Sequence, residues 1–296
     1  MVLLAGLLFA FATAVFKSSS EILSKYSLLE DIDEYVLSWA LRFFAIPPIV
    51  LGLLVFGLPK INSGLVLALS FSAPAGVLAT VLYMKAIKAS DLSIISPISG
   101  ISPVLVLMSS SFIVGEIPSI LGVVGVMVTT AGIYVLKVHE VSSGFSEPFK
   151  AVLREPGSKF MISMLLIYAV TAPVDKIGVE ASSPVFYTFV LHLGQLILLT
   201  PLMMYKNSDW KASIQRNRKE IMAIGGLSGL SSIAQMTALT YTLVVYVVSI
   251  KRSGILLSVL AGHFIYDEKN LMERVSGSII ILLGLLLIAL AGSGII

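Results

Sequence analysis

Two adjacent basic residues, Lys251 and Arg252, lie inside an apolar stretch near the carboxyl-terminal end of the sequence. Inserting a basic side chain at the centre of a membrane costs about 2.5–3.5 kcal/mol on insertion scales. Two adjacent basic residues there are therefore expected to have a function. Arginine presents a planar fork that matches a carboxylate or phosphate, and lysine adds a mobile point charge. The pair therefore indicates an anion-binding site. Alternatively, the two residues pair with acidic side chains elsewhere or reach the membrane surface.

Polar residues in other apolar segments could complete such a site. His192 and Gln195 stand three residues apart and would share one helical face, although a single buried histidine is more often a structural residue. Gln235 is a further candidate. Aromatic residues could form the walls of the site, or could equally belong to the belts at the membrane interfaces. The aromatic candidates are Tyr83 and Tyr246, with Trp39, Tyr168 and Tyr187 as further possibilities.

Lys17 and Glu21 stand four residues apart in the first apolar segment, so a helix would bring them together. Either they form an internal ion pair that offsets the cost of burial, or Glu21 is a proton-coupling carboxylate. For Arg42, Asp175 and Lys176 we expect structural pairing instead.

Glu116 and Glu268 each stand just before an apolar segment begins. An acidic side chain there is expected to cap the positive end of a helix rather than to act in catalysis. The three histidines lack metal-ligand spacing, and cysteine is absent. The sequence also lacks the Gly-x-x-x-x-Gly-Lys and Gly-x-Ser-x-Gly motifs. We therefore expect no enzyme activity, no metal site and no cofactor.

The composition indicates a membrane protein. Of the 296 residues, 57% are hydrophobic and only 12% are charged, whereas soluble domains carry about 25% charged residues. The net charge of +3 does not indicate nucleic-acid binding, because the basic residues fall between apolar runs rather than along one stripe. Ten segments are long enough to span a membrane as helices. They are 2–24, 35–57, 64–86, 92–114, 118–137, 158–179, 184–205, 220–241, 244–266 and 273–294.

The sequence repeats itself after a shift of 152 residues, which needs no gap over about sixty residues. The shift places Glu116 on Glu268, Gly125 on Gly277 and Gly132 on Gly284. Because each half would hold an odd number of helices, the second half must be inverted in the membrane. We therefore predict an all-α membrane protein of ten transmembrane helices in two inverted five-helix repeats. The first repeat covers 1–140, a connecting loop covers 141–157, and the second repeat covers 158–296.

Prolines, small residues and a glutamate follow one another in a set order in the first half: Pro97-Ile98-Ser99-Gly100-Ile101-Ser102-Pro103, Gly115-Glu116, Gly122, Gly125 and Gly132. The second half repeats this order as Ser249-Ile250-Lys251-Arg252-Ser253, Asp267-Glu268, Gly277 and Gly284. The pattern resembles the EamA-type repeat of the drug/metabolite transporter superfamily over nearly the whole chain. This resemblance implies a ten-helix bundle with a central cavity that exports or exchanges metabolites. Many members carry proline near the position of Ser249, whereas the Lys251-Arg252 pair resembles the sugar-phosphate translocator branch.

Together these features predict a secondary transporter of the cell membrane that works by alternating access. We expect a small anionic or zwitterionic substrate, such as an amino acid or a phosphorylated or carboxylated compound, held by Lys251 and Arg252. The alternatives are a magnesium-type cation carrier, a lipid-phosphate flippase and a membrane scaffold or sensor without transport activity. The expected partners are the small-molecule substrate and membrane lipid, not nucleic acid, and the chain is expected to be a monomer or homodimer.

The loop charges predict the orientation of the chain. The odd-numbered connections hold fourteen of the 20 Lys and Arg residues, and the even-numbered connections hold two. Lys and Arg near segment ends favour the cytoplasmic side, so both termini should face outward, whereas the family resemblance implies termini inside. A reporter that is active only in the cytoplasm, fused after Ile296, should therefore stay silent. Strong reporter activity would show that the loop charges do not set the orientation.

Overall fold

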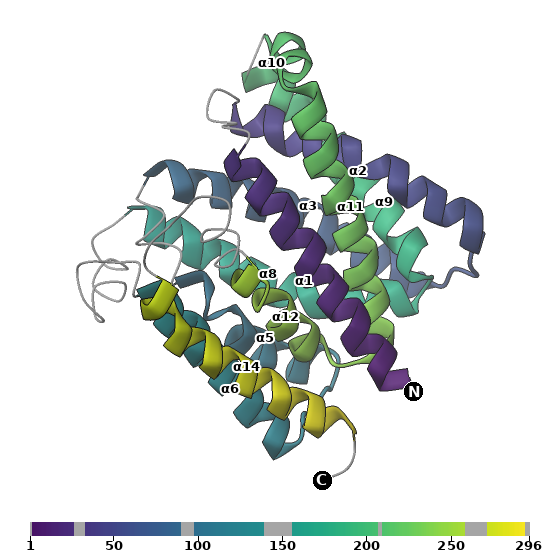
Figure 1. Ribbon diagram of the computed structural model, residues 1–296. Coiled ribbons are helices and arrows are strands. Elements are labelled where there is room, and N and C mark those ends of the chain that lie inside the picture. The colour runs from purple at the N-terminus through teal and green to yellow at the C-terminus, as the bar shows by residue number, and fades with distance from the viewer. Residues whose placement is uncertain are drawn as a thin grey trace.

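The computed structural model describes residues 2–26, 33–89, 98–138, 156–206, 209–257 and 271–293, and the regular elements in these ranges are helices (Figure 1). The first half contains α1 (Val2–Tyr26), α2 (Glu34–Phe56), α3 (Ser63–Ala89), α5 (Ser102–Ile113) and α6 (Ile120–Val138). The second half contains α8 (Pro156–Glu180), α9 (Pro184–Lys206), α10 (Trp210–Arg216), α11 (Arg218–Tyr241), α12 (Val244–Arg252) and α14 (Leu271–Ser293). Eight of these helices match predicted segments to within a few residues.

The segments 92–114 and 244–266 are the two that differ from the prediction, because neither is one continuous helix. In the first, α5 begins only at Ser102, after a turn at Gly100 and Ile101. In the second, α12 ends at Arg252. Residues 90–97 and 258–266 lie outside the described part of the chain.

The described helices have the composition of membrane-spanning segments. Six of them, α1, α2, α3, α8, α9 and α11, are long and apolar enough to cross a membrane, and α5, α6 and α14 contain shorter apolar stretches. Large apolar side chains cover the outside of the bundle, and Leu54, Phe112 and Ile120 are 77%, 87% and 85% exposed. Such a surface suits lipid rather than water. The all-helical membrane class is therefore confirmed, whereas the count of ten spans is not.

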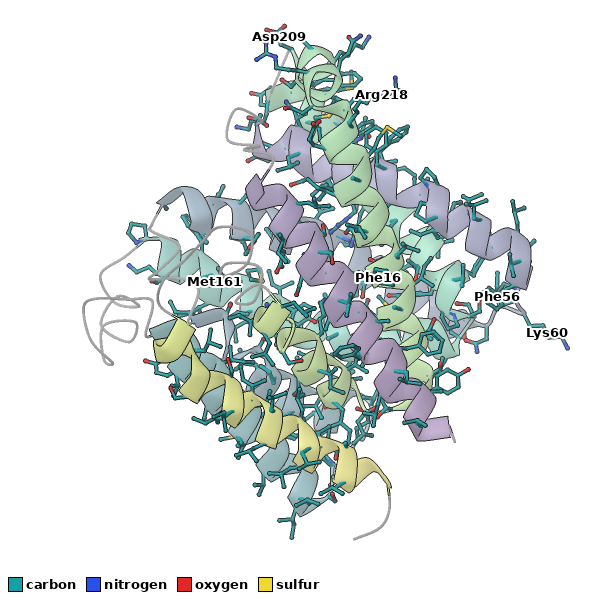
Figure 2. All side chains as sticks on the ribbon, in the orientation of Figure 1. Phe16, Phe56, Lys60, Met161, Asp209 and Arg218 are labelled. Atoms are coloured by element: carbon teal, nitrogen blue, oxygen red, sulfur yellow. The ribbon has the colours of Figure 1, made fainter. Side chains whose placement is uncertain are left out.

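The ends of α2 show how polar residues delimit an apolar helix. Asp33 accepts hydrogen bonds from two backbone N–H groups of the first turn, and Gly57 ends the helix with a positive φ of 74°. Lys60 lies just beyond this end (Figure 2). Asp209 and Arg218 flank α10 at another extremity of the molecule (Figure 2). The charged residues thus mark ends of helices, as expected for a membrane bundle.

The helices of the two halves pair in a reciprocal pattern. α1 packs along α11, and the corresponding helices α8 and α3 also pack along each other. The corresponding helices α2 and α9 are neighbours, as are α6 and α14. Trp39, early in α2, donates a 2.9 Å hydrogen bond to Thr200, late in α9, whereas Gly52, late in α2, lies against Val185, early in α9, so these two helices are antiparallel. Gly125, early in α6, lies against Ile288, late in α14. Both pairs of corresponding helices therefore run in opposite directions.

The glycines that recur in register in the two halves form the contact between α6 and α14. A Cβ atom on Gly284 would lie 2.5 Å from the backbone nitrogen of Thr129, and one on Gly277 would lie 2.6 Å from Cβ of Leu136. Gly125 and Gly132 also face α14, where a Cβ atom would lie 2.9 Å from Ile288 and 2.7 Å from Ile281. Small residues let helix backbones approach in a membrane, where van der Waals packing drives association. The repeated glycines therefore serve packing between the halves.

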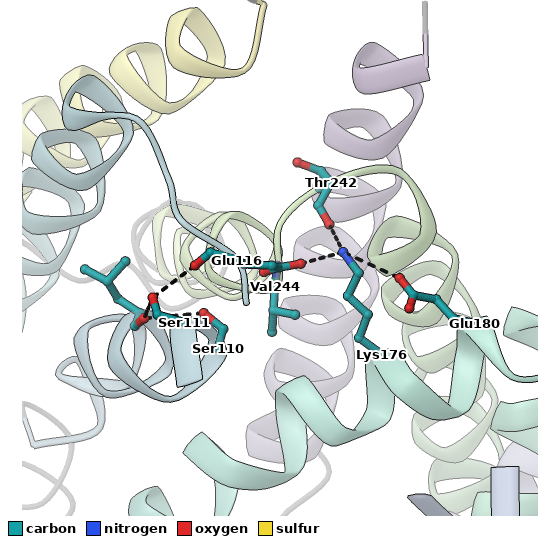
Figure 3. A network of polar contacts seen from close by, with 8 residues as sticks. Ser110, Ser111, Glu116, Lys176, Glu180, Thr242 and Val244 are labelled. Atoms are coloured by element: carbon teal, nitrogen blue, oxygen red, sulfur yellow. Dashed lines mark hydrogen bonds and ion pairs between the residues drawn. The ribbon is translucent and has the colours of Figure 1, made fainter. Parts of the chain in front are cut away.

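A buried ion pair joins the two halves (Figure 3). Glu116 follows α5 in the first half, and its Oε1 pairs with Nζ of Lys176 on α8 in the second half. Oε2 of Glu116 accepts a 2.8 Å hydrogen bond from the backbone N–H of Val244, the first residue of α12. Lys176 also donates to the carbonyl oxygen of Thr242 and lies 4.0 Å from Glu180.

This arrangement refines the prediction for Glu116. The side chain does cap a helix, but the helix is α12 of the other half rather than α6, which follows it in sequence. Ser119 takes the place at the start of α6, where its hydroxyl oxygen accepts from the N–H of Gly122. The expected structural pairing of Lys176 agrees with its bond to Glu116. Glu268 lies outside the described residues.

Replacing Gly284 by Val should destabilise the protein by roughly 1–3 kcal/mol, because the added carbons must push α6 and α14 apart. Thermal unfolding of the purified protein in detergent measures the loss. Gly226→Ala on α11 is the control, because a Cβ atom there meets no atom within 4 Å. Equal unfolding temperatures for Gly284→Val and the unmodified chain would contradict the packing role.

Replacing Glu116 by Gln should lower stability by about 2–4 kcal/mol, because it leaves Lys176 without its close counter-charge in a buried setting. Glu180→Gln is the matched control, since Glu180 is 58% exposed and 4.0 Å from the same lysine. Its effect should stay below about 1 kcal/mol. Similar unfolding temperatures for the two variants would count against Glu116 as the link between the halves.

Candidate anion-binding site

The charged pair lies at an interruption of a helix. α12 ends at Arg252, and the chain turns through Ser253 and Gly254. The N–H groups of Leu256 and Leu257 then donate to carbonyl oxygens three residues earlier, at 2.9 and 3.0 Å. Bonds of this 3₁₀ type inside a longer helical stretch often mark a functional hinge.

Helix α1 passes directly over this interruption. The hydroxyl of Ser18 donates a 2.8 Å hydrogen bond to the carbonyl oxygen of Gly254, one of the carbonyls near the turn. A Cβ atom on Gly254 would collide with that hydroxyl oxygen and with the backbone of Ala14. Glycine is therefore required here for the close approach of α1, whose Ser18 is a second donor to this carbonyl oxygen beside the N–H of Leu257.

The first half has an interruption at the corresponding place. The shift of 152 residues places Ile101 on Ser253 and Ser102 on Gly254. The chain turns at Gly100 and Ile101, and α5 starts at Ser102 with Pro103 in its first turn. Proline lacks an N–H group, so it suits a helix start and disfavours a continuous helix.

Lys251 and Arg252 contact neutral side chains near the two interruptions. Nζ of Lys251 donates a 2.6 Å hydrogen bond to the amide oxygen of Gln235 on α11. Nε of Arg252 donates a 2.9 Å hydrogen bond to the hydroxyl of Ser102, so this bond crosses between the halves. Both basic side chains are half-buried. Neither forms an ion pair with an acidic residue in the described ranges.

The ring of Tyr168 on α8 lies close to both charges. Its centroid is 5.6 Å from Nζ of Lys251 and 5.9 Å from Cζ of Arg252, within the range of cation–π attraction. The hydroxyl of Tyr168 is buried and has no hydrogen-bond partner within the part of the chain that the structure describes. Tyr168 thus combines an electron-rich face toward the cations with a polar group that a ligand could bond.

Other charged groups lie near the pair without neutralising it. The residues close enough to act electrostatically on Lys251, besides Arg252, are Lys17, Glu21 and Asp175. Lys17 and Glu21 are 3.4 Å apart and form the ion pair that their spacing predicted. Asp175 accepts a 2.7 Å hydrogen bond from the hydroxyl of Tyr187. With Lys251 itself included, these described groups are three basic and two acidic side chains, and the remaining positive charge favours a bound anion.

A second polar cluster lies where α2, α9 and α11 meet. Nε of Arg42 donates a 2.7 Å hydrogen bond to the side-chain oxygen of Gln195. His192, one turn earlier on α9, donates through Nδ1 to the carbonyl oxygen of Thr188 at 2.9 Å, and its Nε2 lies 3.4 Å from the hydroxyl of Ser232. Ser232 and Gln235 are three residues apart on α11, so one helical face connects this cluster to Lys251.

Both tryptophans of the chain lie beside the second cluster. Trp39 is one turn before Arg42 on α2, stacks on Phe43 at 5.1 Å and lies 5.8 Å from the ring of Trp210 on α10. The hydrogen bond from Trp39 to Thr200 fixes α2 against α9. This aromatic group closes the cluster toward the end of the bundle where α10 lies.

The structure divides the predicted site residues into three groups. Lys251, Arg252 and Gln235 lie together, and Tyr83 is close enough to Arg252 and Glu21 for their charges to act on it. His192 and Gln195 belong to the second cluster. Tyr246 is buried against Gly122 of α6, and its position five residues before Lys251 turns it about 140° away on the helix.

Three contributors to the site were not among the predicted substrate-binding residues. Tyr168 was only one of several aromatic possibilities, and Asp175 was expected to pair structurally. Ser102 had no signal of its own, because serine is common in apolar helices. Its sequence context could have identified it. Ser102 lies between Gly100 and Pro103, and the repeat shift of 152 places it on Gly254.

Comparison with known proteins gives the family. A family model described as "EamA-like transporter family" matches residues 4–138 and again 156–290. No curated protein matches the chain. A solved structure described as "Crystal structure of protein" resembles it with a TM-score of 0.77 at 14% identity, and the likeness covers 97% of each chain. At this identity the likeness shows a shared fold.

The two matches of the family model cover most of the chain, and each includes one of the two interrupted helices. The apolar helices described above agree with a multi-pass membrane protein. The chain therefore belongs to the EamA-like transporter family and is a membrane transporter of the drug/metabolite transporter superfamily.

Proposed function

We propose that the protein is a secondary transporter of a small anionic or zwitterionic metabolite, and that Lys251 and Arg252 bind the acidic group of the substrate. The observation that carries this proposal is that both cations are anchored by neutral acceptors, Gln235 and Ser102, and form no ion pair within the described ranges. Because no acidic side chain of the described ranges is paired with these cations, an arriving carboxylate or phosphate can pair with them without displacing one.

The surroundings of the pair suit an acidic group of small size. The terminal nitrogens of Arg252 remain available for a bidentate contact because Nε alone is bonded to Ser102. The buried hydroxyl of Tyr168 supplies a further hydrogen-bonding group at the same place. Glu21 and Asp175 lie within electrostatic range of Lys251, so the ammonium group of a zwitterion would find acidic partners nearby.

The proposed mechanism is alternating access between two inverted five-helix repeats, residues 1–140 and 158–296, joined by a loop at 141–157. The reciprocal packing of α1 on α11 and α8 on α3 supports this topology, as does the antiparallel pairing of α6 with α14. In such repeats the binding site lies between the halves, and interrupted helices contribute to it. Arg252 and Ser102 come from different halves, so a relative movement of the halves would change the contacts of an anion bound there.

Replacing Arg252 by Ala should weaken the binding of an anionic substrate by roughly 10- to 100-fold, because it removes a charge-assisted hydrogen bond. The unfolding temperature without substrate should change little, since the contacts of Arg252 in the described ranges are one hydrogen bond to Ser102 and the face of Tyr168, with no ion pair. Substrate-induced thermal shifts, measured across amino acids and phosphorylated metabolites, identify the ligand and measure the loss of affinity in the variant. Lys60→Ala, in an exposed loop, is the control.

The same measurement distinguishes the competing functions. Thermal shifts that survive in the Arg252→Ala variant would contradict the anion site. Stabilisation by Mg²⁺ instead of anions would support a cation carrier. Stabilisation by lipid phosphates alone would support a flippase. Proteoliposomes that show no uptake of any stabilising ligand would contradict transport itself.

A further inference from the structure

Arg42 is a third basic side chain inside the bundle that has no acidic partner among the described residues. It lies on α2, is half-buried, and its only hydrogen bond in the described part of the chain goes to the neutral side chain of Gln195. The bond from Trp39 to Thr200 already joins α2 to α9 one turn away, so Arg42 is not needed as the link between these helices. Charged residues at membrane depth usually face an aqueous pathway and serve function.

Arg42 and Arg252 are held in the same way. Each uses Nε to bond a neutral side chain of the other half, at 2.7 Å in one case and 2.9 Å in the other. The bonded residues are 153 and 150 positions apart, close to the repeat distance of 152. Both bonds therefore lie where corresponding segments of the two halves meet, α2 with α9, and 92–114, which contains α5, with 244–266, which contains α12. Both leave the terminal guanidinium nitrogens without a partner in the described ranges.

Polar side chains connect the two arginine sites. Gln235, which accepts from Lys251, stands three residues from Ser232, which contacts His192. His192 stands three residues from Gln195, which accepts from Arg42. Steps of three residues on a helix keep side chains on one face about 5 Å apart along the axis. A series of polar side chains on α9 and α11 therefore runs from one basic site to the other.

We propose that Arg42 is a second anion-binding point and that the substrate is a compact dianion with an acidic group at each end. One acidic group binds to Lys251 and Arg252, and the other binds to the terminal nitrogens of Arg42. The polar side chains between them, Gln235, Ser232 and His192, contact the middle of the substrate. This proposal rests on the proposed transport function and adds the class of substrate.

The test uses the full chain purified in detergent and isothermal titration with paired probes. Each pair is an α,ω-dicarboxylate of four to six carbons, as in succinate to adipate, and the monocarboxylate of equal length; 3-phosphoglycerate represents the phosphorylated acids. The unmodified protein should bind the best dianion at least about tenfold more tightly than its monoanion. In Arg42→Gln this ratio should fall to about one while the affinity for the monoanion is unchanged. Arg42→Lys should restore part of the ratio, and Lys60→Gln should not alter it.

The variants separate failure of this inference from failure of the proposed function. An unchanged ratio in Arg42→Gln would overturn the role of Arg42, as would equal binding of dianions and monoanions to the unmodified protein. If Arg42→Gln weakens both probes equally and lowers the unfolding temperature, Arg42 is structural and the inference is wrong. Arg252→Gln should weaken both probes. If it weakens neither, or if no anion binds the unmodified protein, the proposed function fails first and the inference fails with it.

Discussion

The uncompensated charge of basic side chains inside an apolar bundle is the constraint around which this protein is built. Lys251 and Arg252 have partial compensation from an amide oxygen, a hydroxyl and the face of Tyr168. These contacts keep the cations in place without cancelling their charge. A carboxylate bonded to either residue would stabilise the empty protein further, but it would also compete with any anionic ligand. Because Gln235 and Ser102 are neutral, the positive charges of Lys251 and Arg252 remain available to an anionic ligand.

The same constraint explains why the helices are interrupted where they are. A continuous α12 would satisfy its own backbone groups and hold Lys251 and Arg252 rigidly along its side. The turn at Ser253 and Gly254 instead lets α1 approach closely, and Ser18 of α1 donates a hydrogen bond to the carbonyl oxygen of Gly254. The interruption therefore ties the charged pair to α1, and Arg252 ties it to α5. Beside the charged pair and its interrupted helix, the glycine contacts of α6 and α14 form a close-packed scaffold.

The helices themselves were largely predictable, because apolar length and short polar connections determine membrane helices strongly. Eight segments agreed with the structure to within a few residues. The interruptions at Gly100 and Ser253 were not predicted, because a short turn inside an apolar segment leaves the apolar composition unchanged. The partner of Glu116 was missed for a similar reason. The sequence showed an acidic residue before a helix, but only the fold reveals that α12, and not α6, begins beside it. Long-range contacts of this kind depend on packing, which a single sequence does not display.

Trp39 and Trp210 are the two tryptophans of the chain, and they lie 5.8 Å apart at one extremity of the bundle. The intrinsic tryptophan fluorescence of the protein therefore originates from a single location. Because Trp39 bonds to α9 and precedes Arg42 by one turn, the emission reports the environment of the α2–α9 junction. Intrinsic tryptophan fluorescence can therefore follow movement at one of the two polar clusters without an added label.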